Sequence, residues 1–179
     1  MRVAVLGEST LARTTRECCR RANHQCTDVR SADIVWIAYD MLIQENGLPN
    51  VQWFLDRVEA DIPNEVPTFT PILISSQIPI GTIARLEQTY PQYFWIYSPE
   101  NIRTAHAVED FMNQSRIVIG SRSSQHDHTI TTLLSPFTPR LFWTTPETAE
   151  MAKHALNVYL ALNITFANEI ARLARVVGA

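Results

Sequence analysis

A short run at the start of the chain has the pattern of a phosphate-binding turn. Residues 3–6 are apolar, and the sequence continues Gly7-Glu8-Ser9-Thr10-Leu11-Ala12. In a GxGxxG turn the first glycine makes the turn, the second lets the backbone approach a pyrophosphate, and the third packs the helix on the strand. The first glycine is present here, and alanine is acceptable at the third position. Ser9 puts a Cβ where phosphate would lie, and Glu8 adds a negative charge beside it.

The helix that follows this turn still favours an anion at its N-terminus. We therefore expect Gly7, Ser9, Thr10 and Leu11 to contact NAD or NADP through a weakened turn. The next strand should end in an acidic residue that holds the ribose hydroxyls. Instead, Asp28-Val29-Arg30 places Arg30 at the expected end. Arg30 could accept the 2′-phosphate of NADP, or it could be an ordinary solvated arginine.

Metal and thiol chemistry have weaker support in the sequence. The segment 125–128 carries His126 and His128, but an i, i+2 spacing points two imidazoles apart on a helix. We predict no metal site. Cys18, Cys19 and Cys26 fit neither a disulfide framework nor a CxxC metal pair, and we interpret them as small apolar core residues.

The elements that position the turn alternate between strand and helix. Buried parallel strands are nearly continuous in apolar residues, and short connections between such strands and helices indicate a Rossmann-type doubly wound parallel sheet of the α/β class. We predict strands at 2–6, 24–29, 33–38, 71–75, 93–97, 116–119 and 139–143, and helices at 11–22, 51–58, 80–90 and 105–112, with a further helical stretch within 121–136.

A long helix should end the chain. Thr144 and Thr145 precede Pro146-Glu147, a strong helix start, and no breaker follows until Gly178. We predict one helix over 146–177, about 45 Å long at 1.5 Å per residue. Its apolar residues lie on more than one face, so we expect another chain or domain to cover part of it. The predicted division is a domain over 1–143 and the long helix over 144–179.

Several separate blocks, in order, resemble the UDP-glucose/GDP-mannose dehydrogenase family. The blocks are 71–82 (PILISSQIPIGT), 98–103 (SPENIR), 108–113 (VEDFMN), 116–120 (RIVIG) and the helix 147–172. With the N-terminal turn, the resemblance covers nearly the whole chain. It implies a nucleotide-sugar 6-dehydrogenase that oxidises the sugar C6 alcohol to a carboxylate, with NAD as the hydride acceptor and a cysteine as the covalent nucleophile.

The resemblance implies catalytic roles for three residues. Lys153 and Asn157 match a lysine and an asparagine on the family's central helix that position substrate and water and stabilise an oxyanion. Their i, i+4 spacing puts them on one face. Alternatively, Glu150 and Lys153 could form an ordinary exposed ion pair. Glu100 matches a carboxylate with an acid/base role.

The sequence also departs from the family pattern. Gln77 stands where the family has a threonine that contacts water and cofactor, and residues 101, 104 and 105 differ in the segment expected to hold the sugar nucleotide. The family's segment between the second and third strands is missing, and its catalytic cysteine belongs to a later domain. We expect either an NAD(P)-binding protein related to these dehydrogenases but lacking that domain, inactive as this chain alone, or a non-catalytic dimeric binding or regulatory module.

Composition narrows the partners. The net charge of −3 comes from mixed signs without a basic run, so we expect neither nucleic acid nor an anionic membrane as a partner. The start lacks the apolar core of a signal peptide, and no apolar stretch reaches the ~20 residues of a membrane span. We expect a cytoplasmic homodimer formed through helix 146–177, with a nucleotide sugar as a possible ligand.

Overall fold

The computed structural model describes residues 1–62, 65–102, 104–123, 125 and 127–179. Within them, seven strands form one sheet in the order β2-β1-β3-β4-β5-β6-β7. The strands are β1 (Arg2–Leu6), β2 (Gln25–Cys26), β3 (Ile34–Ile37), β4 (Pro71–Ile74), β5 (Phe94–Tyr97), β6 (Ile117–Gly120) and β7 (Leu141–Thr144). The α-helices are α1 (Thr10–Arg21), α2 (Val51–Asp61), α3 (Thr82–Thr89), α4 (Ala107–Met112), α5 (Asp127–Leu134) and α6 (Pro146–Val177), with 3₁₀ turns η1 (Thr104–His106) and η3 (Ser135–Phe137).

The sheet is parallel with one exception. All neighbouring strands pair in parallel except β5 and β6, which meet through a single antiparallel pair, Tyr97 and Gly120. The predicted α/β fold with a Rossmann-type sheet is confirmed, and this junction corrects the expectation that every strand would run the same way. β3 and β4 are buried along their whole length, as their unbroken apolar sequences indicate.

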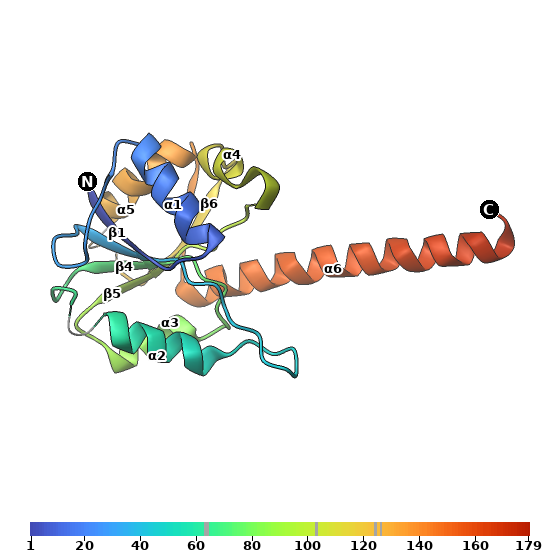
Figure 1. Cartoon of the computed structure of the whole chain (residues 1–179), viewed down its shortest axis with the longest axis horizontal. Coiled ribbons are helices and arrows are strands. Elements are labelled where there is room, and N and C mark those ends of the chain that lie inside the picture. The colour runs from blue at the N-terminus through green and yellow to red at the C-terminus, as the bar shows by residue number, and fades with distance from the viewer. Residues whose placement is uncertain (63–64, 103, 124, 126) are drawn as a thin grey trace.

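Two apolar cores cover the two faces of the sheet. Figure 1 shows α1, α4 and α5 on one side and α2 and α3 on the other. Trp36 and Phe137 belong to the first core, whereas Phe54, Ile72 and Tyr97 belong to the second. Helices on both faces leave the ends of the strands open, and open α/β sheets bind ligands at the carboxyl ends.

β2 is much shorter than the strand predicted at 24–29. Its two residues pair with Arg2 and Val3, at the beginning of β1. The Asp28 carboxylate then accepts hydrogen bonds from the backbone amides of Arg30 and Ser31 and from the Ser31 hydroxyl. This local turn satisfies the backbone in place of the sheet, so the strand stops. The amide of Asp33 already bonds to the carbonyl of Arg2, which starts β3 at the opposite side of β1.

α6 has the bounds predicted from its end signals. The Thr145 hydroxyl accepts a hydrogen bond from the Thr148 amide, and Gly178 closes the helix in the left-handed conformation, at φ 73°. Only the first turns of α6 touch the sheet domain: Pro146, Ala149 and Glu150 are buried. The rest projects away from the domain (Figure 1). Among the described residues, no helix has the length and apolar character needed to cross a membrane.

The packing of α6 on the sheet depends on Gly120 at the end of β6. A Cβ at this position would lie 2.7 Å from the Cα of Pro146 and 2.8 Å from the Cβ of Ala149. The helix therefore rests directly on the strand backbone, and its first turns are fixed relative to the carboxyl edge of the sheet.

Candidate functional site

The turn after β1 requires glycine at its first position. Gly7 has φ +123°, and a Cβ there would lie 2.5 Å from the carbonyl oxygen of Ala38. L-residues rarely adopt this conformation, and the contact with β3 leaves no room for a side chain. The strand-turn-helix geometry of a dinucleotide site is therefore kept at Gly7.

Ser9 acts as the N-cap of α1. Its Oγ accepts a hydrogen bond from the Ala12 amide at 3.0 Å and donates one to the Ala38 carbonyl at 2.9 Å. One of the free amides at this helix end is thus already satisfied, while Thr10 and Leu11 begin the helix. The serine at the second glycine position therefore serves the protein's own structure.

The charges around the turn have mixed signs. The Glu8 side chain is 92% exposed and lies 3.7 Å from the guanidinium of Arg16. That guanidinium donates hydrogen bonds to the carbonyls of Val5 and Gly7, at 2.9 and 2.6 Å. Arg16 therefore partly compensates the charge of Glu8 and holds the end of β1 at the same time.

Two clefts open at the carboxyl edge, where the strand order changes direction between β1 and β3. The first, about 470 Å³, is lined by Gly7, Glu8, Ser9, Tyr39, Asp40, Leu42, Trp53 and Arg57. The second, about 680 Å³, is lined by Leu11, Tyr39, Asp40, Met41, Ile43, Gly47, Pro49, Gln77, Ile78, Pro79, Glu100 and His154. Tyr39 and Asp40 belong to both, so the clefts adjoin at the switch point where this kind of sheet binds nucleotides.

Tyr39 fixes the wall between the clefts. Its backbone amide donates to the Ser76 hydroxyl at 2.8 Å, and its phenol donates to the Asp61 carboxylate at 2.7 Å. Burial, together with the bond to Asp61, raises the pKa of Tyr39 far above its ordinary value. The phenol therefore stays protonated at physiological pH and serves as a structural donor.

Lys153 and Glu100 come together beside the larger cleft, which Glu100 lines. The Lys153 ammonium donates to the backbone carbonyl of Glu100 at 2.5 Å and to the Oδ1 of Asn101 at 3.3 Å, and lies 3.8 Å from the Glu100 carboxylate. The other Glu100 oxygen accepts from the amide of Ile102. Asn157, one turn beyond Lys153, is half-buried. The structure thus joins Lys153 and Glu100, 53 positions apart, into one polar group that also includes the side-chain amide of Asn101.

Most of the residues predicted from sequence share the carboxyl edge. Gly7, Ser9, Leu11, Gln77 and Glu100 line the two adjoining clefts, and Gln77 is exposed within the larger one. Lys153 reaches the same edge through Glu100. Thr10, at the first position of α1, is exposed beside the turn.

Arg30 is not brought to this edge. Its guanidinium makes a paired contact with the carboxylate of Glu65, at 2.7 and 2.9 Å. Glu65 lies in the connection that leads to the amino end of β4, and β2 ends level with Val3, three residues before the end of β1. Arg30 therefore belongs to the opposite end of the sheet.

Two residues at this edge gave little sequence signal. Glu150 was considered as half of an exposed ion pair with Lys153, but it is fully buried and bonds to the amides of Gly81 and Ile83. That interpretation was wrong. His154 was not singled out, although its Nε2 lies 2.9 Å from the Ile78 carbonyl and its side chain lines the larger cleft. For Glu150, the available signal was its position between Ala149 and Met151 on the first turns of an apolar helix, which indicates a buried carboxylate that needs partners.

The cysteines contribute no reactive thiol to the two clefts within the described residues. Cys18 and Cys19 are buried on α1, and burial raises their pKa to about 11 and about 12. All three cysteines are free. The described residues contain no group of three metal-ligating side chains. His126, and Arg103 at the end of the 98–103 block, lie outside the described residues.

Comparisons with known proteins agree with this geometry. Residues 4–138 match the NAD binding domain of the UDP-glucose/GDP-mannose dehydrogenase family, and residues 147–179 match its central domain. UDP-glucose 6-dehydrogenase TuaD of Bacillus subtilis is 31% identical over 84% of this chain, and the UDP-glucose 6-dehydrogenase of Rhizobium meliloti is 32% identical over 86%. The aligned regions are 34% and 38% of those relatives, so the chain spans about a third of their length.

Solved structures give the same fold. GDP-mannose dehydrogenase from Pseudomonas aeruginosa superimposes with a TM-score of 0.82 at 18% identity, covering 100% of this chain and 54% of that one. UDP-D-ManNAc dehydrogenase from Pyrococcus horikoshii gives a TM-score of 0.82 at 21% identity, covering 100% and 55%. At these identities the likeness establishes the fold, including the long helix after the sheet.

Proposed function

The chain belongs to the UDP-glucose/GDP-mannose dehydrogenase family, and we propose that it is a nucleotide-binding unit of a nucleotide-sugar dehydrogenase that assembles through α6. The observation that carries the proposal is the convergence of the Gly7 turn, Gln77 and the Glu100–Lys153 pair on two adjoining clefts at one edge of the sheet. A cytoplasmic location is consistent with this role and stays a prediction.

NAD fits the smaller cleft through the turn after β1. Gly7 brings the backbone against β3, and the amides at the start of α1 offer hydrogen bonds to a pyrophosphate. The acidic Glu8 and Asp40 at the mouth, and the Ser9 cap, support weak binding. Glu65 holds Arg30 at the other end of the sheet. Arg30 therefore gives the clefts no preference for the 2′-phosphate of NADP. When bound, NAD would supply the hydride acceptor.

The polar group at the larger cleft would act on the sugar. Lys153 is cationic and sits against the Glu100 segment, so it can stabilise negative charge on an oxygen, and Asn157 can donate its amide on the same helix face. Glu100 lines the cleft and can exchange a proton with a bound hydroxyl or water. We assign catalytic positions to Lys153, Asn157 and Glu100 on these grounds.

The 179-residue chain by itself should not complete the oxidation. A covalent route from aldehyde to acid needs an activated thiol, and Cys18 and Cys19 are buried with raised pKa values, while Cys26 bonds to the carbonyl of Arg16. We therefore expect the isolated chain to form no sugar carboxylate from UDP-glucose and NAD. Steady formation of that carboxylate above a no-enzyme blank would contradict this reasoning.

A non-catalytic binding or regulatory dimer is the second candidate. It is favoured by the phosphate turn, where Ser9 already occupies the Ala12 amide and Glu8 carries a negative charge. Calorimetric titration with NAD, NADP and UDP-glucose separates the two. Binding of NAD or UDP-glucose supports the dehydrogenase unit, and the absence of any binding at millimolar ligand supports the second candidate.

A further inference from the structure

A buried carboxylate on α6 caps a helix from a different part of the chain. Glu150 is 0% exposed, and its two oxygens accept hydrogen bonds from the amides of Gly81, at 2.6 Å, and Ile83, at 3.0 Å. Gly81 is the N-cap of α3 and has no side chain to satisfy these amides. The charge of Glu150 replaces the missing cap and meets the positive end of the α3 dipole. This pairing offsets the cost of burying a carboxylate.

One turn further along α6, His154 holds the other end of the same loop. Its Nε2 lies 2.9 Å from the carbonyl oxygen of Ile78, which is buried. A carbonyl only accepts, so this ring nitrogen carries the hydrogen. Glu150 and His154 are four residues apart and share a helix face. Together they grip the loop between β4 and α3, one through its amides and the other through a carbonyl.

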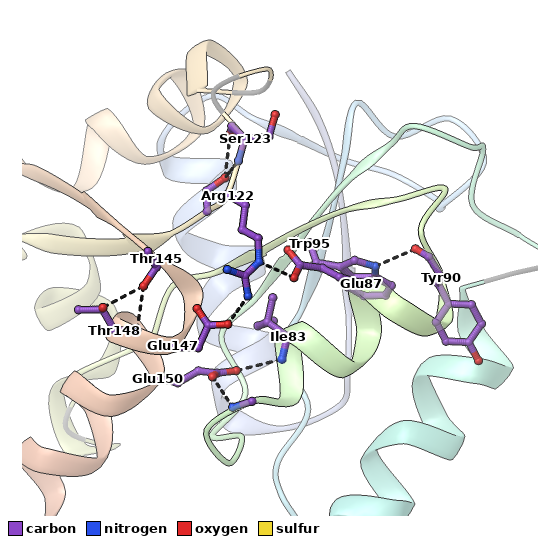
Figure 2. A network of polar contacts seen from close by, with 12 residues as sticks. Ile83, Glu87, Tyr90, Trp95, Arg122, Ser123, Thr145, Glu147, Thr148 and Glu150 are labelled. Atoms are coloured by element: carbon purple, nitrogen blue, oxygen red, sulfur yellow. Dashed lines mark hydrogen bonds and ion pairs between the residues drawn. The ribbon is translucent and has the colours of Figure 1, made fainter.

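A third contact, made by Arg122, connects α6 to the last turn of α3. Arg122, just after β6, donates to the Glu87 carboxylate on α3 at 2.7 Å and to Glu147 on α6 (Figure 2). Glu147 precedes Glu150 by one turn, so α6 is joined to both ends of α3. Figure 2 shows Glu150 directed at the start of α3 and Arg122 between Glu87 and Glu147.

The loop between β4 and α3 carries three of the cleft residues, Gln77, Ile78 and Pro79. Gln77 immediately precedes Ile78, and Gln77, Glu100 and His154 line the same cleft of about 680 Å³. Lys153, between Glu150 and His154 in sequence, holds the Glu100 carbonyl. The consecutive residues Lys153 and His154 of α6 therefore hold two loops that both line this cleft.

We infer that Glu150 and His154 are positioning residues that set Gln77 relative to Lys153 and Glu100, so that α6 templates the ligand cleft. This inference rests on the proposed nucleotide-binding function of the same clefts. Neither residue needs to touch the ligand. Their effect passes through residues 78–83, which are the end of the loop and the start of α3. The geometry of this segment depends on which hydrogen-bonding group each side chain presents.

The test removes or replaces the hydrogen-bond donor that residue 154 presents to the Ile78 carbonyl. His154→Leu removes the hydrogen bond to Ile78 with little change in side-chain volume, whereas His154→Gln can place its amide N–H near the position of Nε2. We expect His154→Leu to weaken UDP-glucose binding, measured by calorimetry, by about tenfold, and His154→Gln to restore it to within about threefold of the parent protein. His128→Leu, at an exposed histidine on α5, is the matched control and should leave affinity unchanged.

A second measurement reads the loop without a ligand. In the parent protein, the amide chemical shifts of Gly81 and Ile83 should titrate with Glu150, and Glu150→Gln should abolish that titration. Burial raises the pKa of Glu150, so the titration should be centred above its ordinary value of 4.5.

The outcomes separate the two proposals. If the parent protein binds UDP-glucose and His154→Leu binds it equally tightly, the positioning role is wrong and the proposed function stands. Failure of His154→Gln to recover affinity, with both variants folded, also overturns the positioning role. If neither NAD nor UDP-glucose binds the parent protein, the proposed function fails, and the inference that depends on it fails too.

Discussion

Replacing Leu162 on α6 with aspartate should dissociate a dimer. Tyr159, Leu162 and Phe166 are 63%, 64% and 68% exposed in the single chain, and their spacing places them along one stripe of the helix. The sheet domain does not cover this stripe, because only the first turns of α6 touch it. We therefore predict that the stripe packs against its copy in a second chain, as a two-fold contact.

The size of the effect follows from the exposure. Full burial of a leucine is worth about 1.5–3 kcal/mol, so the exposed two-thirds of Leu162 leaves about 1–2 kcal/mol to gain in each chain. A two-fold dimer loses this twice, and a carboxylate at the contact adds a desolvation cost. A total near 3 kcal/mol corresponds to about a hundredfold weaker dimer.

Sedimentation equilibrium at micromolar concentration is the assay. Ile164 is 63% exposed, closely matching Leu162, but lies about 160° around the helix, so Ile164→Asp is the control and should leave the dimer intact. A parent protein that stays monomeric across this range would refute the argument. Equal dissociation by both variants would show that the stripe was chosen wrongly.

Three further predictions concern the sheet domain. The native phosphate turn should bind NAD no tighter than high micromolar, and Glu8→Gly with Ser9→Gly should tighten it in calorimetry; submicromolar native affinity would show that the turn is undamaged. Burial lowers the pKa of His24 from 6.5. The contribution of neutral His24 to stability is therefore present above that pH and lost as the pH falls through the lower folded-state pKa. Thermal melts should show that His24→Gln loses less stability in acid than the parent protein. Gly120→Ala should destabilise the domain by about 1–3 kcal/mol in denaturant unfolding, because the new Cβ meets the backbone of Pro146; an unchanged midpoint would show that α6 can shift without cost.

The fold was predictable where local chemistry and the tertiary structure agree. α6 begins and ends where its threonine caps, Pro146 and Gly178 indicate, and β3 and β4 follow their continuous apolar runs. β2 was overestimated because the Asp28 side chain competes with the sheet for backbone amides, an effect that apolar periodicity does not report. The antiparallel junction of Tyr97 with Gly120 is a nonlocal property without a sequence signature.

The site was predictable mainly through the family resemblance. The blocks pointed to Lys153 and Glu100, but their contact spans 53 positions and needs the folded sheet to exist. Arg30 was placed at the expected end of the second strand, and the shortened β2 makes that placement misleading. A solvated pair of Glu150 with Lys153 was one of two alternatives, because a carboxylate three residues from a lysine usually indicates such a pair. Only the position of α3 reveals that Glu150 is buried.

The projecting part of α6 has a consequence for hydrogen exchange. Helices in water owe most of their stability to packing, and beyond its first turns this helix packs against nothing in its own domain. In a separated chain, its later amide protons should exchange by local opening that costs far less than global unfolding, while those near Ala149 should share the protection of the sheet. Protection along the rest of α6 would then depend on protein concentration, so that deuterium uptake there reports how much of the helix is covered.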